Sequence, residues 1–155
     1  MLKKVMLLVL VVTVVLELQL LMAGCNENQA PKVQEVTFDQ LFANLDKYNG
    51  NEIIIEGFYF HGFEVIVLSE SLEYSGYAQG HLIPKGGEVW VEGGIPKDVY
   101  DTLYQQQMMG PTERYGKVRV EGKFEYGAEY GHLGAFSAQI VPSEVELLQW
   151  SPPAW

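Results

Sequence analysis

The chain has 155 residues, which is enough for one domain with its own hydrophobic core and hardly enough for two. Its 20 Asp and Glu residues outnumber its 10 Lys and Arg residues, giving a formal net charge of −10. Nucleic-acid-binding proteins neutralise phosphates with Lys and Arg, so no nucleic-acid partner is expected. The single cysteine, Cys25, excludes an internal disulfide and a thiolate metal cluster.

The first 24 residues have the pattern of a signal peptide. A short basic start, Met1 to Lys4, precedes an apolar run from Val5 to Leu16. This run is shorter than the roughly 20 residues that a membrane-spanning helix needs, and it has the length of a signal-peptide core. We therefore expect residues 1–24 to be removed from the mature protein.

The segment Leu21-Met-Ala-Gly-Cys25 places small residues directly before the single cysteine. It resembles the lipobox, the cleavage and lipidation signal of bacterial lipoproteins. The resemblance implies that Cys25 becomes the first mature residue and carries acyl chains such as palmitate. Each buried CH2 of an acyl chain contributes about 0.8 kcal/mol, so several chains would hold the protein on a membrane. The alternative is a free buried cysteine after an ordinary signal peptide or an anchor helix.

This resemblance also implies a location in the bacterial cell envelope, on a membrane and facing the periplasm or the cell exterior. Residues 25–35 are mostly polar and predict a lipidated tether. A single domain is expected over residues 36–150, followed by a short tail over residues 151–155.

The first half of the domain predicts a helix followed by strands. Thr37 and Gln40 are spaced as a capping box, and an apolar stripe then continues to Tyr48. Glu52 to Phe60 and Glu64 to Leu68 predict a hairpin. The Gly- and Pro-containing stretch from Ser69 to Gly87 predicts a long loop, and Glu88 to Glu92 predicts a third strand.

The second half predicts another helix and two more strands. The helix is expected to begin at Pro96 and to end before Gly110. From Lys117 to Tyr126 apolar and charged residues alternate strictly, which indicates a half-buried strand. Gly122 interrupts the apolar face of this strand and indicates a bend or a close backbone approach. Phe136 to Leu148 predicts the fifth strand.

This order of elements predicts a mainly β protein with an OB-like barrel of five strands. An N-terminal helix comes first, and a second helix lies between strands three and four. The region from Thr37 to Leu148 resembles OB-type domains of uncharacterised envelope lipoproteins, with Gly131-His-Leu-Gly134 as its most distinctive piece. That resemblance implies no established activity. An open antiparallel β-sandwich is the alternative, because counting strands does not show closure.

Four residues are the candidates for binding a ligand. His61 and Phe63 fall in the connection after the first strand, and Tyr130 and His132 fall in the loop before the last strand. In OB-folds these two loops flank the ligand-binding face. Aromatic rings and an acidic surface suit a protein or glycan of the envelope better than nucleic acid. We therefore expect a binding module, which does not require catalysis.

The alternative function is a small metal-assisted hydrolase. Its ligands would come from His61, His81 and His132 together with Glu64 or Glu129, because imidazole and carboxylate groups both suit zinc. The spacing of these residues is not diagnostic of a metal site, and loop histidines are the ordinary explanation. No phosphate-binding loop, nucleophile elbow or zinc-protease helix occurs in the sequence. The sequence thus predicts no catalytic residue, metal or cofactor.

Overall fold

A computed structural model describes residues 33–108 and 110–154 of the chain. The chain divides into two units, Met1–Lys32 and Val33–Trp155, and the fold reported below is that of the second unit. The expected signal peptide, the lipidation site Cys25 and most of the expected tether lie outside the described residues. No helix in the described part has the length and apolar character needed to span a membrane.

The domain is mainly β, as expected from the sequence. Its strands are β1 (Gln34–Val36), β2 (Glu52–Gly62), β3 (Val65–Tyr74), β4 (Leu82–Val91), β5 (Tyr104–Gln106), β6 (Glu113–Tyr130) and β7 (Phe136–Leu147). Its helices are α2 (Phe38–Ala43), α3 (Leu45–Tyr48) and α4 (Lys97–Thr102), with a 3-10 turn, η1 (His132–Gly134). The seven strands described form one sheet in the order β1-β2-β3-β4-β7-β6-β5.

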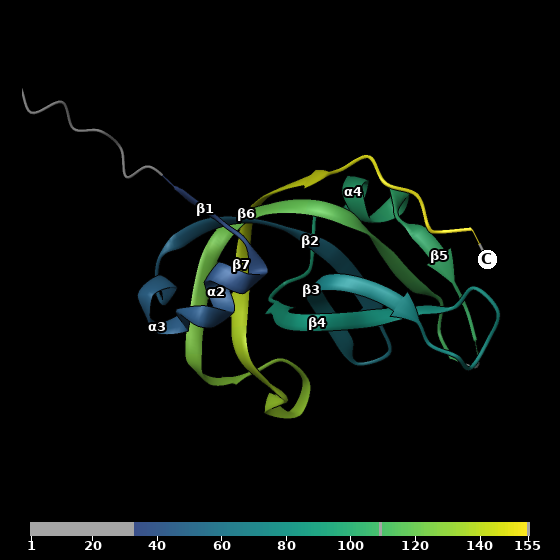
Figure 1. Ribbon diagram of the computed structural model, residues 1–155, viewed down its shortest axis with the longest axis horizontal. Coiled ribbons are helices and arrows are strands. Elements are labelled where there is room, and N and C mark those ends of the chain that lie inside the picture. The colour runs from purple at the N-terminus through teal and green to yellow at the C-terminus, as the bar shows by residue number, and fades with distance from the viewer. Residues whose placement is uncertain (1–32, 109, 155) are drawn as a thin grey trace, which may run out of the picture. The chain divides into compact units, whose positions relative to one another are not determined.

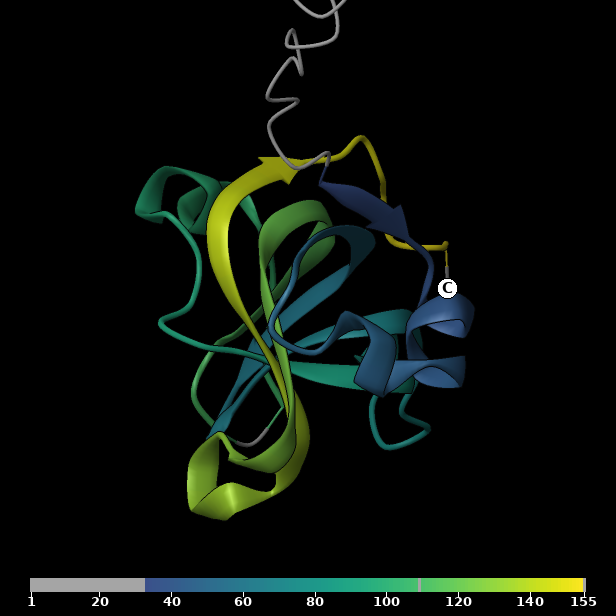
Figure 2. The same ribbon diagram turned by 90° about the vertical axis from the view of Figure 1, so that its left-hand side faces the viewer.

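The sheet closes on itself through an additional pairing of β2 with β6. Strands β2, β3, β4, β7 and β6 therefore form a ring, which is visible in Figures 1 and 2. The pairing of β4 with β7 is parallel, whereas the other pairings within the ring are antiparallel. The sheet is thus mixed and differs from the open antiparallel sandwich considered above. Helix α4 lies between the third and fourth strands of the ring in chain order, as predicted.

The alternating segment of β6 behaves as its sequence predicts. Val118, Val120 and Phe124 are fully buried, whereas the charged residues between them are partly or fully exposed. Gly122 lies at a bulge where β6 pairs with β7. A β-carbon added at this glycine would collide with the carbonyl oxygen of Val141. The expected close backbone approach at Gly122 is therefore confirmed.

The expected N-terminal helix is present, but it is divided in two. The capping box forms, because the Gln40 amide donates to Thr37 Oγ1 at 3.2 Å and the Thr37 amide donates to Gln40 Oε1 at 3.1 Å. Asn44 has non-helical dihedral angles and separates α2 from α3. Its side chain donates to the Gln40 carbonyl, a local bond of the kind that ends helices.

Three expectations about loops and boundaries are wrong. The long loop expected from Ser69 to Gly87 is mostly strand, and only residues 75–81 connect β3 to β4. The second helix ends at Thr102, and β5 follows it and pairs with β6. The tether was expected to extend to residue 35, but Gln34 already pairs in parallel with Ile53 of β2. The domain therefore begins two residues earlier than its expected start at residue 36.

The C-terminal segment packs against the strands. The Trp150 ring makes edge contacts with Phe58, Tyr104 and Tyr115, at centroid distances of 5.1 to 6.2 Å. The Tyr104 hydroxyl donates to the Trp150 carbonyl, and the Tyr74 hydroxyl donates to the Pro153 carbonyl, both at 3.0 Å. These contacts fix the tail on the surface of the domain as far as Pro153.

Candidate functional site

Two loops that are far apart in sequence meet at one end of the domain. The turn between β2 and β3 and the loop between β6 and β7 lie side by side at the lower end of Figures 1 and 2. His132 Nε2 in the second loop is 3.4 Å from Glu64 Oε2 in the first. We call the surface formed by Phe63, Glu64, His132 and Leu133 the loop surface.

The loop surface presents two large apolar side chains to solvent. Phe63 is 67% exposed and Leu133 is 90% exposed. A single exposed apolar side chain is normal, but neighbouring ones on adjoining loops are typical of interaction sites. The Glu64–His132 pair lies between the two loops and provides polar groups beside these side chains.

The backbone of the loop surface is conformationally unusual. Glu64 and Leu133 have φ angles of 60° and 55°, and they are the two non-glycine residues with positive φ among those described. Such conformations cost of order 1–3 kcal/mol in non-glycine residues and concentrate at functional sites. Gly131, which precedes η1, and Gly134, its last residue, also have positive φ, which allows the tight turn that projects Leu133.

His61 does not belong to the loop surface. It was expected in the loop after the first strand, but it lies within β2 because this strand extends to Gly62. Its ring packs against Tyr100 at a centroid distance of 5.3 Å. Burial, with a smaller effect of the nearby Arg114 charge, holds the pKa of His61 below its ordinary value. His61 therefore faces the side of the domain that carries α4 and remains neutral at lower pH than a solvent-exposed histidine.

Tyr130 lies at the base of the β6–β7 loop. It is the last residue of β6, is half-buried, and pairs in register with Phe136 across the loop. It packs with a hydrophobic cluster that includes Phe60 and Trp90. Of the four residues predicted to bind a ligand, Phe63 and His132 lie in the loop surface, Tyr130 ends the strand that leads into it, and His61 lies elsewhere.

The third histidine, His81, takes part in a separate buried network. It is 6% exposed, and its Nε2 lies 2.8 Å from Glu113 Oε2. The Gln106 side-chain amide donates to the same carboxylate oxygen at 2.8 Å and also to the Leu82 carbonyl. This network ties the start of β4 to β5 and β6.

The three histidines thus occupy three different environments. In residues 33–108 and 110–154, no group of three His, Cys, Asp or Glu side chains is placed to hold a metal ion. The metal-assisted hydrolase required His61, His132 and a glutamate to converge, and the described residues do not show this arrangement. Sequence reasoning missed Leu133, although its flanking glycines already indicated a tight turn.

No known protein family matches this chain. A comparison with curated proteins also finds no significant match. Inference about function therefore depends on the residues of the chain itself.

Proposed function

We propose that this protein is a lipid-anchored binding module of the bacterial cell envelope. An OB-like barrel presents the loop surface, and the loop surface recognises an envelope partner. The single observation that carries the proposal is the meeting of the two loops at Glu64 and His132, with Phe63 and Leu133 exposed beside them. Lipid anchoring rests on the resemblance of Leu21-Met-Ala-Gly-Cys25 to a lipobox.

The strand connections support the OB-like barrel. An OB-fold is a partly open barrel of five strands whose first and last long loops flank the ligand-binding face. Here five strands form a ring, the third and fifth of them pair in parallel, and α4 follows the third. The two loops that meet at the loop surface follow the first and fourth strands of the ring. Because one fold hosts many functions, the fold alone does not identify the partner.

The chemistry of the loop surface favours a protein over a glycan as the partner. A glycan needs several hydrogen-bonding groups around a stacking ring, whereas the loop surface presents an aliphatic and an aromatic side chain beside the single Glu64–His132 contact. The loop surface also lies at the opposite end of the domain from β1, where the chain enters it (Figures 1 and 2). A partner can thus dock away from the point of entry.

The anchor is tested by replacing Cys25 with serine. Serine has no thiol for acylation, so the Cys25→Ser chain is expected to lose palmitate labelling and to move from the membrane fraction to the soluble fraction. Radiolabelled palmitate incorporation and membrane fractionation in a lipoprotein-processing bacterium measure this. A Cys25→Ser chain that still fractionates with membranes and incorporates label would contradict the lipobox assignment.

The partner site is tested with the double substitution Phe63→Ser and Leu133→Ser. Apolar residues at the centre of an interface often contribute 1–2 kcal/mol each or more, so we expect the yield of cross-linked partner to fall by about tenfold or more. In-cell cross-linking followed by mass spectrometry measures this yield. Tyr77→Ser is the matched control, because Tyr77 is 82% exposed on the separate β3–β4 connection.

The control should capture the same partner as the unmodified chain. Equal capture by the double variant and the unmodified chain would place the binding site elsewhere on the domain. Retention on purified peptidoglycan that depends on Phe63 and Leu133 would instead identify a glycan as the partner. The described residues give no observation that favours the metal-assisted hydrolase, and we do not propose it.

A further inference from the structure

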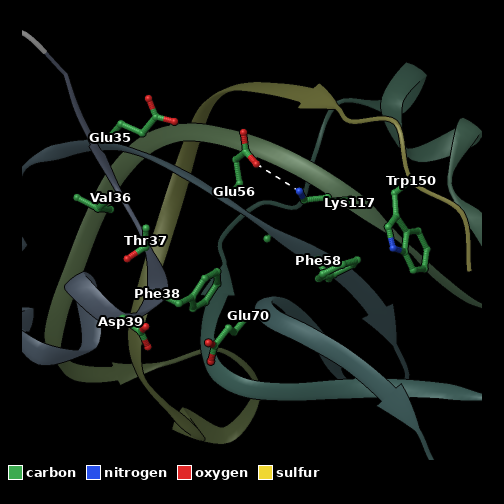
Figure 3. Close-up of a pocket in the computed structure, with 11 residues that line it drawn as sticks. Glu35, Val36, Thr37, Phe38, Asp39, Glu56, Phe58, Glu70, Lys117 and Trp150 are labelled. Carbon is green, nitrogen blue, oxygen red and sulfur yellow. Dashed lines mark ion pairs between the residues drawn. The ribbon is translucent and has the colours of Figure 1, made fainter. Parts of the chain in front are cut away.

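A groove of about 530 Å³ runs along β2 and shares no residue with the loop surface (Figure 3). Three aromatic side chains form much of its wall: Phe38 from α2, Phe58 from β2 and Trp150 from the C-terminal segment. Acidic side chains surround these rings. The groove is thus apolar inside and negatively charged at its edge.

The groove lies where β2 changes its pairing partner from β1 to β3. Strand β1 pairs with β2 as far as Ile55, whereas β3 begins to pair at Phe58. Glu56 and Gly57 lie between these two ladders, where β1 and β3 diverge. A β-carbon at Gly57 would lie 2.8 Å from the Phe38 ring, so the glycine lets this ring pack directly on the strand.

The charges at the edge of the groove are only partly balanced. Glu35 and Glu56 have basic neighbours, since Arg119 lies 2.8 Å from Glu35 and Lys117 lies 3.4 Å from Glu56. Asp39 and Glu70 form no ion pair within the described residues. Figure 3 shows both of these carboxylates at the end of the groove occupied by Phe38, away from Trp150. This end therefore has an unbalanced negative charge next to an aromatic ring.

Glu70 lies opposite a β-bulge. Ser69 pairs with Glu88 and Ser71 pairs with Lys85, so the single residue Glu70 of β3 faces two residues of β4, which carries the extra residue. The opposing residues are Gly86 and Gly87, and a β-carbon at Gly86 would collide with the Glu70 carboxylate. The Gly87 amide donates to Glu70 Oε2 at 3.5 Å. The two glycines of the bulge thus leave room for the Glu70 carboxylate beside β4.

We propose that this groove binds a lysine or arginine side chain of an extended peptide segment in a partner protein. Such a side chain has an apolar stem and a cationic end, which match the aromatic wall and the Asp39–Glu70 end of the groove. The aromatic rings add an attraction for a cation that passes over their faces. Charge complementarity and the shape of an open groove select a basic peptide over an apolar or anionic occupant. This binding is independent of the loop surface.

The test is a titration of the detergent-solubilised full chain with a fluorescein-labelled peptide of alternating lysine and alanine, followed by fluorescence anisotropy. The double substitution Asp39→Asn and Glu70→Gln removes both unbalanced charges and keeps the side-chain shapes. We expect it to raise the Kd about fivefold or more, because each exposed carboxylate contributes modestly to attraction. Asp46→Asn with Glu144→Gln removes the same charge from exposed positions outside the groove and should change the Kd less than about twofold.

Several outcomes would overturn the proposal. Equal weakening of peptide binding in the two double variants would show a general attraction of cations to an acidic protein. Absence of saturable binding at millimolar peptide would exclude the site altogether. Displacement of the peptide by an equal concentration of spermine would identify a small polycation as the occupant. Unchanged peptide binding by the Phe63→Ser, Leu133→Ser chain is expected, and it separates this site from the loop surface.

Discussion

Replacement of Gly122 by alanine is expected to lower the free energy of unfolding by about 3 kcal/mol, at the upper end of the cost of overpacking a core. The added β-carbon would collide with the Val141 carbonyl oxygen and lie 2.9 Å from the Pro142 α-carbon. Both atoms belong to the backbone of β7, so no side-chain rotation relieves the contact. Strands β6 and β7 would have to separate at this bulge. Urea denaturation followed by circular dichroism measures the loss.

Gly110→Ala is the matched control for this substitution. A β-carbon at Gly110 meets no described atom within 4 Å, and the φ angle of this glycine is not positive. The change should therefore alter the free energy of unfolding by less than about 0.5 kcal/mol. A loss below about 1 kcal/mol for Gly122→Ala would show that the two strands adjust easily, and that the close approach does not constrain the ring.

Replacement of Glu113 by alanine is the second substitution expected to have a large effect. The Glu113 carboxylate accepts hydrogen bonds from His81 Nε2 and from the Gln106 side-chain amide, both at 2.8 Å. His81, which is almost completely buried, would lose the acceptor of its Nε2, and the Gln106 amide would keep only the Leu82 carbonyl. Leaving a buried donor unsatisfied costs roughly 1–3 kcal/mol, so we expect the free energy of unfolding to fall by about 3 kcal/mol. Urea unfolding monitored by tryptophan fluorescence measures the change.

Glu73→Ala provides the comparison for Glu113→Ala. Glu73 forms an ion pair with Lys85, and both side chains are well exposed to solvent. Exposed ion pairs contribute about 0–1 kcal/mol, so this change should be nearly neutral. Similar losses for the two substitutions would mean that burial of the His81 network adds nothing to stability. Glu113→Gln keeps one acceptor oxygen and should lose less stability than Glu113→Ala.

The parts of the fold that could be predicted are those set by local patterns. The alternation from Lys117 to Tyr126 requires one buried and one exposed face, and the capping box at Thr37 depends on residues three positions apart. The region from Ser69 to Gly87 could not be predicted in this way. Its glycines are typical of loops, yet Gly86 and Gly87 form the bulge of a strand, opposite Glu70. The two ends of this stretch pair with each other as a hairpin, and no local alternation of apolar and polar residues indicates that pairing.

In the candidate site, too, the features set by local sequence could be predicted and the contacts set by the fold could not. Phe63 and His132 could be predicted because they fall in connections between clear strands. The contact of His132 with Glu64 could not be predicted from spacing, because it depends on the pairing of β3 with β4 and of β4 with β7, which are remote in sequence. His61 was misplaced because β2 extends two residues beyond the predicted end at Phe60, and strand ends are poorly defined by local sequence.

Closure of the ring also affects how copies of this protein behave when they are crowded together. The long strands β2, β3, β4, β6 and β7 each pair with two neighbours, although β4 pairs with β7 only at Trp90 and Val91, and the terminal strands of the described sheet are β1 and β5, of three residues each. An exposed strand edge can pair with the edge of another molecule, and the strength of that pairing grows with the number of backbone hydrogen bonds it offers. Edges of three residues offer very few backbone hydrogen bonds. The two terminal strands therefore offer neighbouring copies few backbone groups for forming an intermolecular sheet.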